Sequence, residues 1–285
     1  MIRLITDSAA DLSPELRHQY DIEVLPLIVR FDEESYLDGV DMTAEQFYPR
    51  LSAAETLPTT SQLNPDAFLE IFRPHLEAGD EIVGIFLSSE LSGTYQSACI
   101  AREMLLAQDA SLGGRIHLVD SRTVTLGLAL LLVEAARLRD NGCSAALLVE
   151  RVAEMSGRVR LIAVLDTLKY LKMGGRISAA TAFVGGILGI NPLVAVVDGK
   201  VEAAGKVRGR PAAYAWMAER LAEEPPVSDA TIVFGHANTP GGMAELRGVL
   251  RAYDIPEIAA TVAIGSVVGT YTGPGAVGIA WLAAQ

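Results

Sequence analysis

Short apolar runs alternate along the chain with longer segments of helical periodicity. In the first half, the apolar runs predict strands at Ile2–Thr6, Glu23–Arg30, Ile82–Leu87 and Ile116–Val119. Helical segments are predicted to begin at Pro65, Ser92, Val124 and Ser144. Strands that alternate with helices are typical of βαβ units, so we predict an N-terminal α/β domain with a mostly parallel sheet flanked by helices.

The pattern changes after Gly157. A strand is predicted at Arg160–Leu165, and the Asp198–Gly199 turn between two apolar runs predicts a β-hairpin. The later elements are predicted as helices over Pro211–Ala222 and Gly241–Tyr253, a strand at Ala230–Phe234 and a glycine-rich final strand pair. We therefore expect an α/β domain at residues 1–157 and an α+β domain at residues 158–285, with an extensive interface between them.

Composition places this pattern in an acidic globular protein. The 285 residues are 50% hydrophobic and carry a formal net charge of -12, which argues against disorder, against a nucleic-acid partner and against more than transient membrane contact. Residues 258–285 contain no charged side chain but several glycines and Pro274, and so predict buried strands and turns rather than a membrane span. Two isolated cysteines, and an acid already at Asp7, favour a cytoplasmic location.

Small polar residues follow four of the predicted strands. These pairs are Asp7-Ser8, Ser88-Ser89, Asp120-Ser121 and Asp166-Thr167. The carboxyl ends of parallel strands meet at one edge of a sheet, which is where ligands bind in open α/β folds. The same residues also cap helices, so both interpretations stay open at this point.

Two hydroxyl-rich segments precede predicted helices. Ser92-Gly93-Thr94 follows the third strand, and Thr59-Thr60-Ser61-Gln62 precedes the helix start at Pro65. Free backbone N–H groups at helix starts favour an anion, so these segments suit a carboxylate or phosphate. Arg176, which follows two glycines, adds a guanidinium suited to the same groups.

Several catalytic arrangements are disfavoured. Gly273–Gly278 matches a dinucleotide-binding motif, but only seven residues follow it. The four histidines show no metal-ligand spacing, so we expect neither a metal nor a cofactor. Asp11, in a helix-start pattern, and Asp38 and Asp41, beside a turn, are interpreted as structural rather than catalytic.

In these motifs the sequence resembles the bacterial DegV family. The matching segments run in order along nearly the whole chain: Thr6–Leu12, Tyr36–Asp41, Thr60–Gln62, Ser88–Gln96, Leu168–Ile177 and Gly273–Gly275. The resemblance implies a two-domain protein that binds one long-chain fatty acid in an apolar tunnel between the domains. It further implies a lipid-binding subunit of fatty acid kinase, active in phospholipid metabolism, that presents the carboxylate to a separate ATP-binding subunit and is not itself an enzyme.

The resemblance also implies the site residues. The carboxylate is expected at Thr60, Ser61, Ser92, Gly93 and Tyr271, and Arg176 is expected at the head group and the kinase partner. Tyr271 stands where the family commonly has histidine, and Asn191 where lysine is frequent. The apolar tunnel is expected to be lined by Phe183, Ile187, Leu188, Ile190, Leu193, Ile264 and Val267.

Two other functions stay open. One is a hydrolase or transferase with Ser92 as nucleophile and His117 or His236 as base, provided that folding brings them together. The other is a carrier of a different apolar anion. Sequence alone leaves open the preferred chain length, the oligomeric state and the existence of a cognate kinase subunit.

Overall fold

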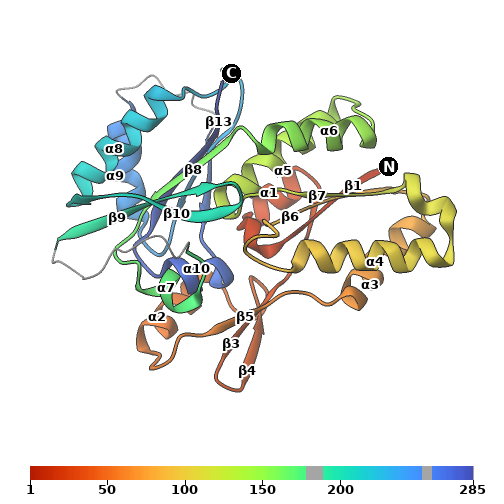
Figure 1. Ribbon diagram of the computed structural model, residues 1–285, viewed down its shortest axis with the longest axis horizontal. Helices are drawn as coiled ribbons and strands as arrows, with labels where there is room; N and C mark the ends of the chain where they lie inside the picture. Colours follow the sequence, from red (N-terminus) through yellow and green to blue (C-terminus); the bar gives the residue numbers. More distant parts are fainter. Residues whose placement is uncertain (178–188, 252–258, 285) are drawn as a thin grey trace.

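Two larger sheets organise the molecule, one in each half of the chain (Figure 1). The computed structural model describes residues 1–177, 189–251 and 259–284. The N-terminal sheet is parallel, and its strands in spatial order are β2 (Ile22–Leu25), β1 (Ile2–Asp7), β6 (Glu81–Phe86) and β7 (Ile116–Asp120). This confirms the expected parallel sheet flanked by helices.

The predicted strand Glu23–Arg30 is wrong as a single element. The chain leaves β2 at Pro26, which has no N–H group to continue a sheet ladder, and enters β3 (Ile28–Phe31). Strand β3 lies at the centre of a small antiparallel sheet between β4 (Glu34–Leu37) and β5 (Thr59–Ser61). This sheet carries Thr60 at its edge.

Helices cover both faces of the parallel sheet. Helices α3 (Pro65–Glu77) and α4 (Thr94–Gln108) bury phenylalanine and alanine side chains against one face. Helices α5 (Thr125–Asp140) and α6 (Ala145–Ser156) pack on the other face, and Ser144 caps α6 as predicted. The remaining N-terminal helices are η1 (Ser8–Ala10), α1 (Pro14–Gln19), α2 (Ala44–Ala53) and η2 (Ala110–Gly114).

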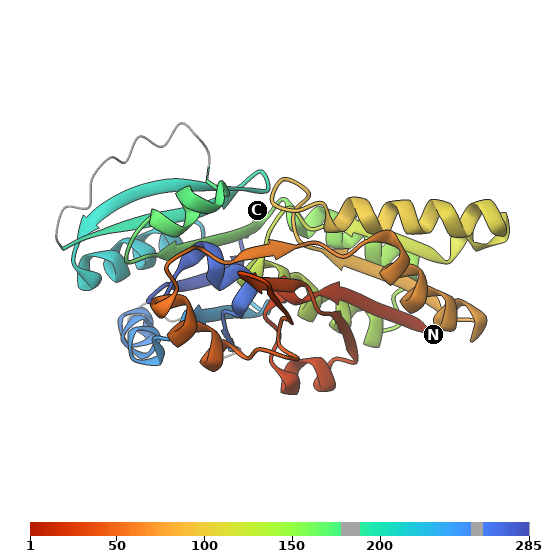
Figure 2. The same ribbon diagram turned by 90° about the horizontal axis from the view of Figure 1, so that it is seen from below.

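The described residues of the C-terminal half form a mixed sheet of six strands. In spatial order they are β10 (Lys200–Arg208), β9 (Ile190–Val197), β8 (Val159–Val164), β13 (Val277–Leu282), β11 (Ile232–His236) and β12 (Ala259–Ala263). The hairpin predicted around Asp198–Gly199 is confirmed as β9–β10. Helices α8 (Arg210–Glu223) and α9 (Pro240–Leu250) cover one face of this sheet, and α7 (Lys169–Gly174) lies beyond the carboxyl end of β8 (Figures 1 and 2).

The predicted final strand pair is wrong in two respects. Strands β12 and β13 do not pair with each other, because β11 lies between them. They are also separated by a helix, α10 (Ser266–Thr272), in a segment whose valines favour a strand locally. Asp11 accepts a hydrogen bond from the N–H of Gly265, and Asp38 accepts one from the N–H of Ser266. These caps come from residues remote in sequence, so local patterns could not indicate the helix.

Candidate functional site

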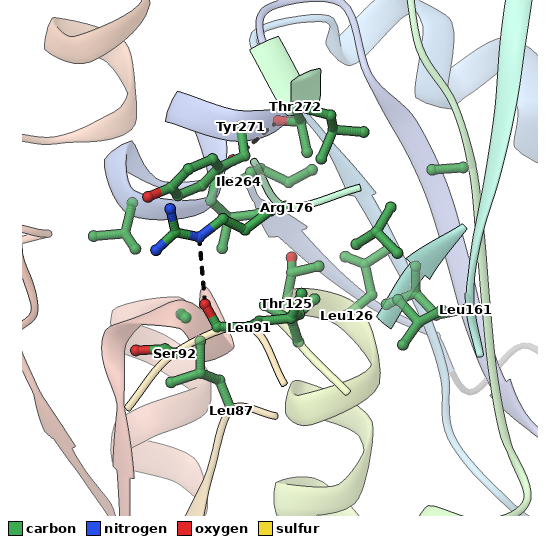
Figure 3. Close-up of a pocket in the computed structure, with 18 of the residues that line it drawn as sticks. Leu87, Leu91, Ser92, Thr125, Leu126, Leu161, Arg176, Ile264, Tyr271 and Thr272 are labelled. Atoms are coloured by element: carbon green, nitrogen blue, oxygen red, sulfur yellow. Dashed lines mark hydrogen bonds between the residues drawn. The ribbon is translucent and has the colours of Figure 1, made fainter. Parts of the chain in front are cut away.

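An apolar cavity of about 170 Å³ lies between the two halves of the molecule (Figure 3). The C-terminal sheet contributes alternate residues of β8 and its continuation, Leu161, Ala163 and Leu165, which share one face of the strand. Helix α5 contributes Leu126, and the N-terminal half contributes Leu27 and Leu87. The interior is therefore a surface of aliphatic side chains, suited to an aliphatic ligand.

Polar side chains gather at one end of this cavity, which we call the cavity mouth and define as Thr60, Ser92, Arg176 and Tyr271. The hydroxyls of Thr60 and Tyr271 share a hydrogen bond of 2.6 Å, which joins the small antiparallel sheet to α10. Ser61 and Gly93 also line the cavity. The structure thus brings together all six residues that sequence placed at the head group.

Arg176 spans the cavity mouth. Its Nη1 donates to the carbonyl oxygen of Gly174 at 2.7 Å, and its Nε donates to that of Leu91 at 3.4 Å (Figure 3). The guanidinium carbon lies 4.9 Å from the centre of the Tyr271 ring, in cation–π geometry. In the described parts of the chain no carboxylate forms an ion pair with Arg176, so its positive charge is available to an anion at the mouth.

The Ser92 segment enters α4 without a side-chain cap. The helix begins at Thr94, its N-cap residue is Gly93, and the Ser92 hydroxyl bonds to the Thr94 hydroxyl at 3.0 Å. A Cβ atom at Gly93 would lie 2.1 Å from Oε1 of Gln62, so the Gln62 side chain of the other hydroxyl-rich segment packs directly against Gly93 and would have to move for a larger residue. The predicted start at Ser92 is displaced by two residues. The Ser92 side chain lines the cavity and accepts a hydrogen bond of 3.4 Å from the N–H of Thr94.

Thr125 is a lining residue that the sequence did not indicate. Its φ of 46° is unusual for a β-branched residue, and its hydroxyl donates to Asp11 at 2.6 Å. Backbone strain of this kind persists only where the surroundings impose it. The first turn of α5 is thus held in place by the side chain of Asp11, which follows η1, and this contact fixes one wall of the cavity.

The predicted tunnel residues divide into three groups. Ile264 and Val267 line the cavity. Leu193 does not: it packs in the core beneath α8 and α9, because it points to the opposite face of β9 from its neighbour Val194, which does line the cavity. Ile190 at the start of β9 is not among the lining residues. Phe183, Ile187 and Leu188 lie outside the described residues.

Three buried carboxylates, Asp7, Asp11 and Asp38, form what we call the acidic cluster. Asp7 accepts hydrogen bonds from the N–H groups of Ala9 and Leu87, and Asp38 accepts from the N–H and hydroxyl of Ser266. Burial raises the pKa of Asp7 to about 7, the pKa of Asp11 well above its usual range, and the pKa of Asp38. Asp11 and Asp38 therefore serve the structural role that was predicted, although Asp11 binds α5 and α10 rather than starting α1.

The residues required for the alternative hydrolase do not meet. His117 bonds to the carbonyl oxygen of Gly114, and His236 accepts a hydrogen bond from the N–H of Thr239. Burial lowers the pKa of His236, and neither histidine lines the cavity that contains Ser92. Within the described residues, Ser92 therefore has no histidine base.

The small polar residues that follow the predicted strands do not all meet at one edge of a single sheet. Asp7 and Asp120 are the last residues of β1 and β7, and Ser89 follows β6, which lies between these strands. The Ser89 hydroxyl donates to Asp120 at 2.5 Å. Asp166 follows β8 in the other sheet and pairs with Arg210. Among the described residues, no group of three or more histidines, cysteines and acids is arranged to hold a metal ion, and no helix is both long and apolar enough to cross a membrane.

Comparison with known proteins agrees with this geometry. The model of the "Uncharacterised protein, DegV family COG1307" family matches residues 1–284. A DegV domain-containing protein from Caldanaerobacter subterraneus is 36% identical over 280 residues, which is 98% of this chain and 97% of that protein.

Two solved structures have the same fold over nearly their whole length. One is a fatty-acid-binding DegV family protein from Thermus thermophilus, with 30% identity, a TM-score of 0.89 and 99% of each chain covered. The other is a stearic-acid-binding protein from Eubacterium ventriosum, with 28% identity, a TM-score of 0.88, and 99% of this chain and 98% of that one covered. Sequence, fold and the polar-ended apolar cavity agree, and the chain belongs to the DegV family.

Proposed function

We propose that the protein binds one long-chain fatty acid, with the acyl chain in the apolar cavity and the carboxylate at the cavity mouth. The observation that carries the proposal is the position of the mouth: three hydroxyls and one guanidinium lie together at one end of an otherwise aliphatic cavity. Similarity to solved DegV proteins described as fatty-acid-binding supports the same ligand.

The free energies of methylene burial and of hydrogen bonding indicate that the acyl chain is the main source of affinity. Burial of each methylene contributes about 0.8 kcal/mol, whereas one neutral hydrogen bond contributes about 0.5 to 1.5 kcal/mol. The hydroxyls of Thr60, Ser92 and Tyr271 therefore fix the depth and orientation of the carboxylate more than they fix the affinity. Arg176 adds the positive charge that a carboxylate requires.

We further propose that the bound carboxylate is presented to a separate kinase subunit, which transfers a phosphoryl group from ATP to form an acyl phosphate. The mouth suits this role because the side chains of Arg176 and Ser61 reach the molecular surface beside it. Phosphoryl transfer needs a positioned acceptor and positive charge beside the transferred phosphoryl group. The hydroxyls of the mouth position the carboxylate, and Arg176 supplies one positive charge beside it. The protein then acts as a carrier rather than as an enzyme.

Native mass spectrometry of freshly purified protein, followed by organic extraction, tests the ligand. We expect one fatty acid per chain. Absence of bound lipid, together with no uptake on incubation with fatty acids, would contradict the proposal. Recovery of a bile acid or another apolar anion in its place would support the alternative carrier function.

Ser92→Ala tests presentation. We expect the variant to bind fatty acid within about tenfold of the wild type, because the chain dominates affinity. In a reconstituted assay with a bacterial fatty acid kinase ATP-binding subunit, it should yield much less acyl phosphate, because the carboxylate is no longer oriented. Ser111→Ala, at an exposed serine remote from the cavity, is the control. Equal phosphoryl transfer by Ser92→Ala and the control would refute this role for Ser92.

A further inference from the structure

A second cavity, of about 500 Å³, adjoins the apolar cavity. Leu161, Ala195 and Val196 line both cavities, so the two share a wall at these residues. In Figure 3, Leu161 lies at the end of the apolar cavity opposite Ser92 and Arg176. The shared wall is therefore at the end that the terminal carbons of an acyl chain approach when its carboxylate is at the mouth.

The shared wall is where strands β8 and β9 separate. Their antiparallel pairing ends at the pair Ile162–Ala195. Beyond this point, Val159–Leu161 of β8 stay paired with β13, whereas Val196 and Val197 of β9 stay paired with β10. The sheet is thus forked, and Ala195, with the shortest side chain of the three shared residues, lies at the base of the fork.

Contacts with the N-terminal half hold the fork open. The β9–β10 hairpin extends from the C-terminal sheet toward the N-terminal sheet (Figure 1). At its tip, the carbonyl oxygen of Gly199 accepts a buried hydrogen bond of 2.8 Å from the Ser88 hydroxyl, and Asp198 pairs with Arg122 at 3.2 Å. A Cβ atom at Gly199 would lie 2.5 Å from the Ser88 oxygen, so this approach requires glycine. The separation of β9 from β8 is therefore part of the fold.

The second cavity differs chemically from the first. Its lining includes the guanidiniums of Arg122, Arg160 and Arg220 and the carboxylates of Asp198 and Glu224. Arg122 pairs with Asp198 at 3.2 Å and Arg160 pairs with Glu224 at 2.6 Å. Arg220 pairs with Glu223 through Nη2, but its buried Nε has no hydrogen-bond partner among the described residues. A buried donor without a partner is costly, and an oxygen atom of a ligand or water would satisfy it. The cavity therefore suits an oxygen-bearing group better than a methyl group.

We infer that the fork between β8 and β9 admits the distal end of an acyl chain whose last carbon carries an oxygen group, as in an ω-hydroxy or ω-carboxy fatty acid, and that the second cavity receives this group. The inference rests on the proposed function, because the first carboxylate must occupy the cavity mouth. A closed aliphatic tunnel would bury a second carboxylate without a partner, whereas passage through the fork brings it to the cavity where the buried Nε of Arg220 lacks an acceptor among the described residues.

The test compares dissociation constants of monocarboxylic acids with those of dicarboxylic acids of equal length, from about 10 to about 20 carbons. For short chains, whose second carboxylate stays in the aliphatic cavity, we expect weakening by about a thousandfold. For chains long enough to reach the second cavity, the difference should fall to about tenfold or less. A large penalty at every length overturns the inference, whereas failure of all monocarboxylic acids to bind contradicts the proposed function instead.

Two variants locate the effect. Ala195→Leu fills the base of the fork and should restore the large penalty for long dicarboxylic acids, with short monocarboxylic acids bound as in the wild type. Ala212→Leu, at an exposed position of α8 outside both cavities, controls for the added volume. Arg220→Gln, which leaves the fork unaltered, should weaken long dicarboxylic acids alone by about tenfold. An unchanged length profile in both Ala195→Leu and Arg220→Gln would also overturn the inference.

Discussion

The acidic cluster and the cavity mouth are two polar groups at opposite ends of one short helix, α10. At its first residues, the N–H groups of Gly265 and Ser266 donate to Asp11 and Asp38, deep in the protein. Near its last residues, the Tyr271 hydroxyl bonds to Thr60 at the edge of a cavity. The same element is thus anchored at one end and exposed to ligand at the other.

The difference shows which polar residues are free to act on a ligand. Strongly shifted pKa values often indicate functional sites, yet here the carboxyl groups whose pKa values are raised belong to the acidic cluster, whose oxygens bind backbone N–H groups and hydroxyls of the protein. The mouth relies on neutral hydroxyls and one guanidinium. Hydrogen-bond partners, rather than titration behaviour, therefore separate the structural site from the candidate binding site.

The largest effect that would test the contrast between the acidic cluster and the cavity mouth is a pH dependence of the unfolding free energy caused by Asp7. Its pKa is raised from 3.8 to about 7 on folding, so between these values the folded state binds more protons than the unfolded state. The contribution of Asp7 to the free energy of unfolding is fully present below about pH 4 and is lost as the pH rises to about 7. The unfolding free energy should fall by up to about 1.4 kcal/mol per pH unit, and by about 4 kcal/mol in total. Urea unfolding at a series of pH values measures it.

Asp7→Asn removes the titrating group and is the matched comparison. The difference in unfolding free energy between wild type and variant should decrease as the pH rises from about 4 to about 7 and should then be constant. Glu70→Gln, at an exposed position of α3, should show no such change. A pH-independent difference between wild type and Asp7→Asn would show that Asp7 ionises normally.

Removal of the anchor at the first turn of α10 should have the next largest effect. Asp11→Ala leaves the Gly265 N–H and the Thr125 hydroxyl without their acceptor, at a cost of about 3 kcal/mol in unfolding free energy. Asp11→Asn, which keeps one acceptor oxygen, should lose less. The exposed Glu70→Ala should change stability by less than about 0.5 kcal/mol. Equal losses of unfolding free energy for Asp11→Ala and Glu70→Ala would show that Asp11 does not anchor the first turn of α10.

The smallest effect is expected at the mouth itself. Tyr271→Phe removes the hydrogen bond to Thr60 but keeps the ring beneath Arg176, so fatty acid affinity should fall by about threefold. A double-mutant cycle with Thr60→Val, measured by isothermal titration calorimetry, should give a coupling energy of about 0.6 kcal/mol, which corresponds to the same threefold change. Additive effects of the two substitutions would indicate that the 2.6 Å contact does not contribute to ligand binding.

Much of the fold was predictable because local periodicity and tertiary environment agree. The strands of the parallel sheet, the Ser144 cap and the β9–β10 hairpin follow patterns within single segments. Helix α10 was not predictable, because its caps, Asp11 and Asp38, lie more than two hundred residues away in the sequence. The sequence predicts β2 and β3 as one strand, because the apolar run continues through Pro26.

The candidate site was predictable in its polar part and less so in its apolar part. The six residues expected at the head group stand in short motifs, and all of them line the cavity. The walls depend on which face of a strand meets the cavity: Val194 faces it and the adjacent Leu193 does not. Thr125 carried no sequence signal, because its position depends on a positive φ and on Asp11.

Helix α5 has a consequence for how the chain folds. It packs against the parallel sheet through one side and against β8, β11 and β13 through another, so that eleven of its residues are buried. A helix that is apolar all round cannot remain exposed to water. Residues 1–157 expressed alone would expose half of this surface and should aggregate, and the intact chain should unfold in a single cooperative transition. The helix thus makes the two halves one folding unit, and the cavity between them forms only when that unit is complete.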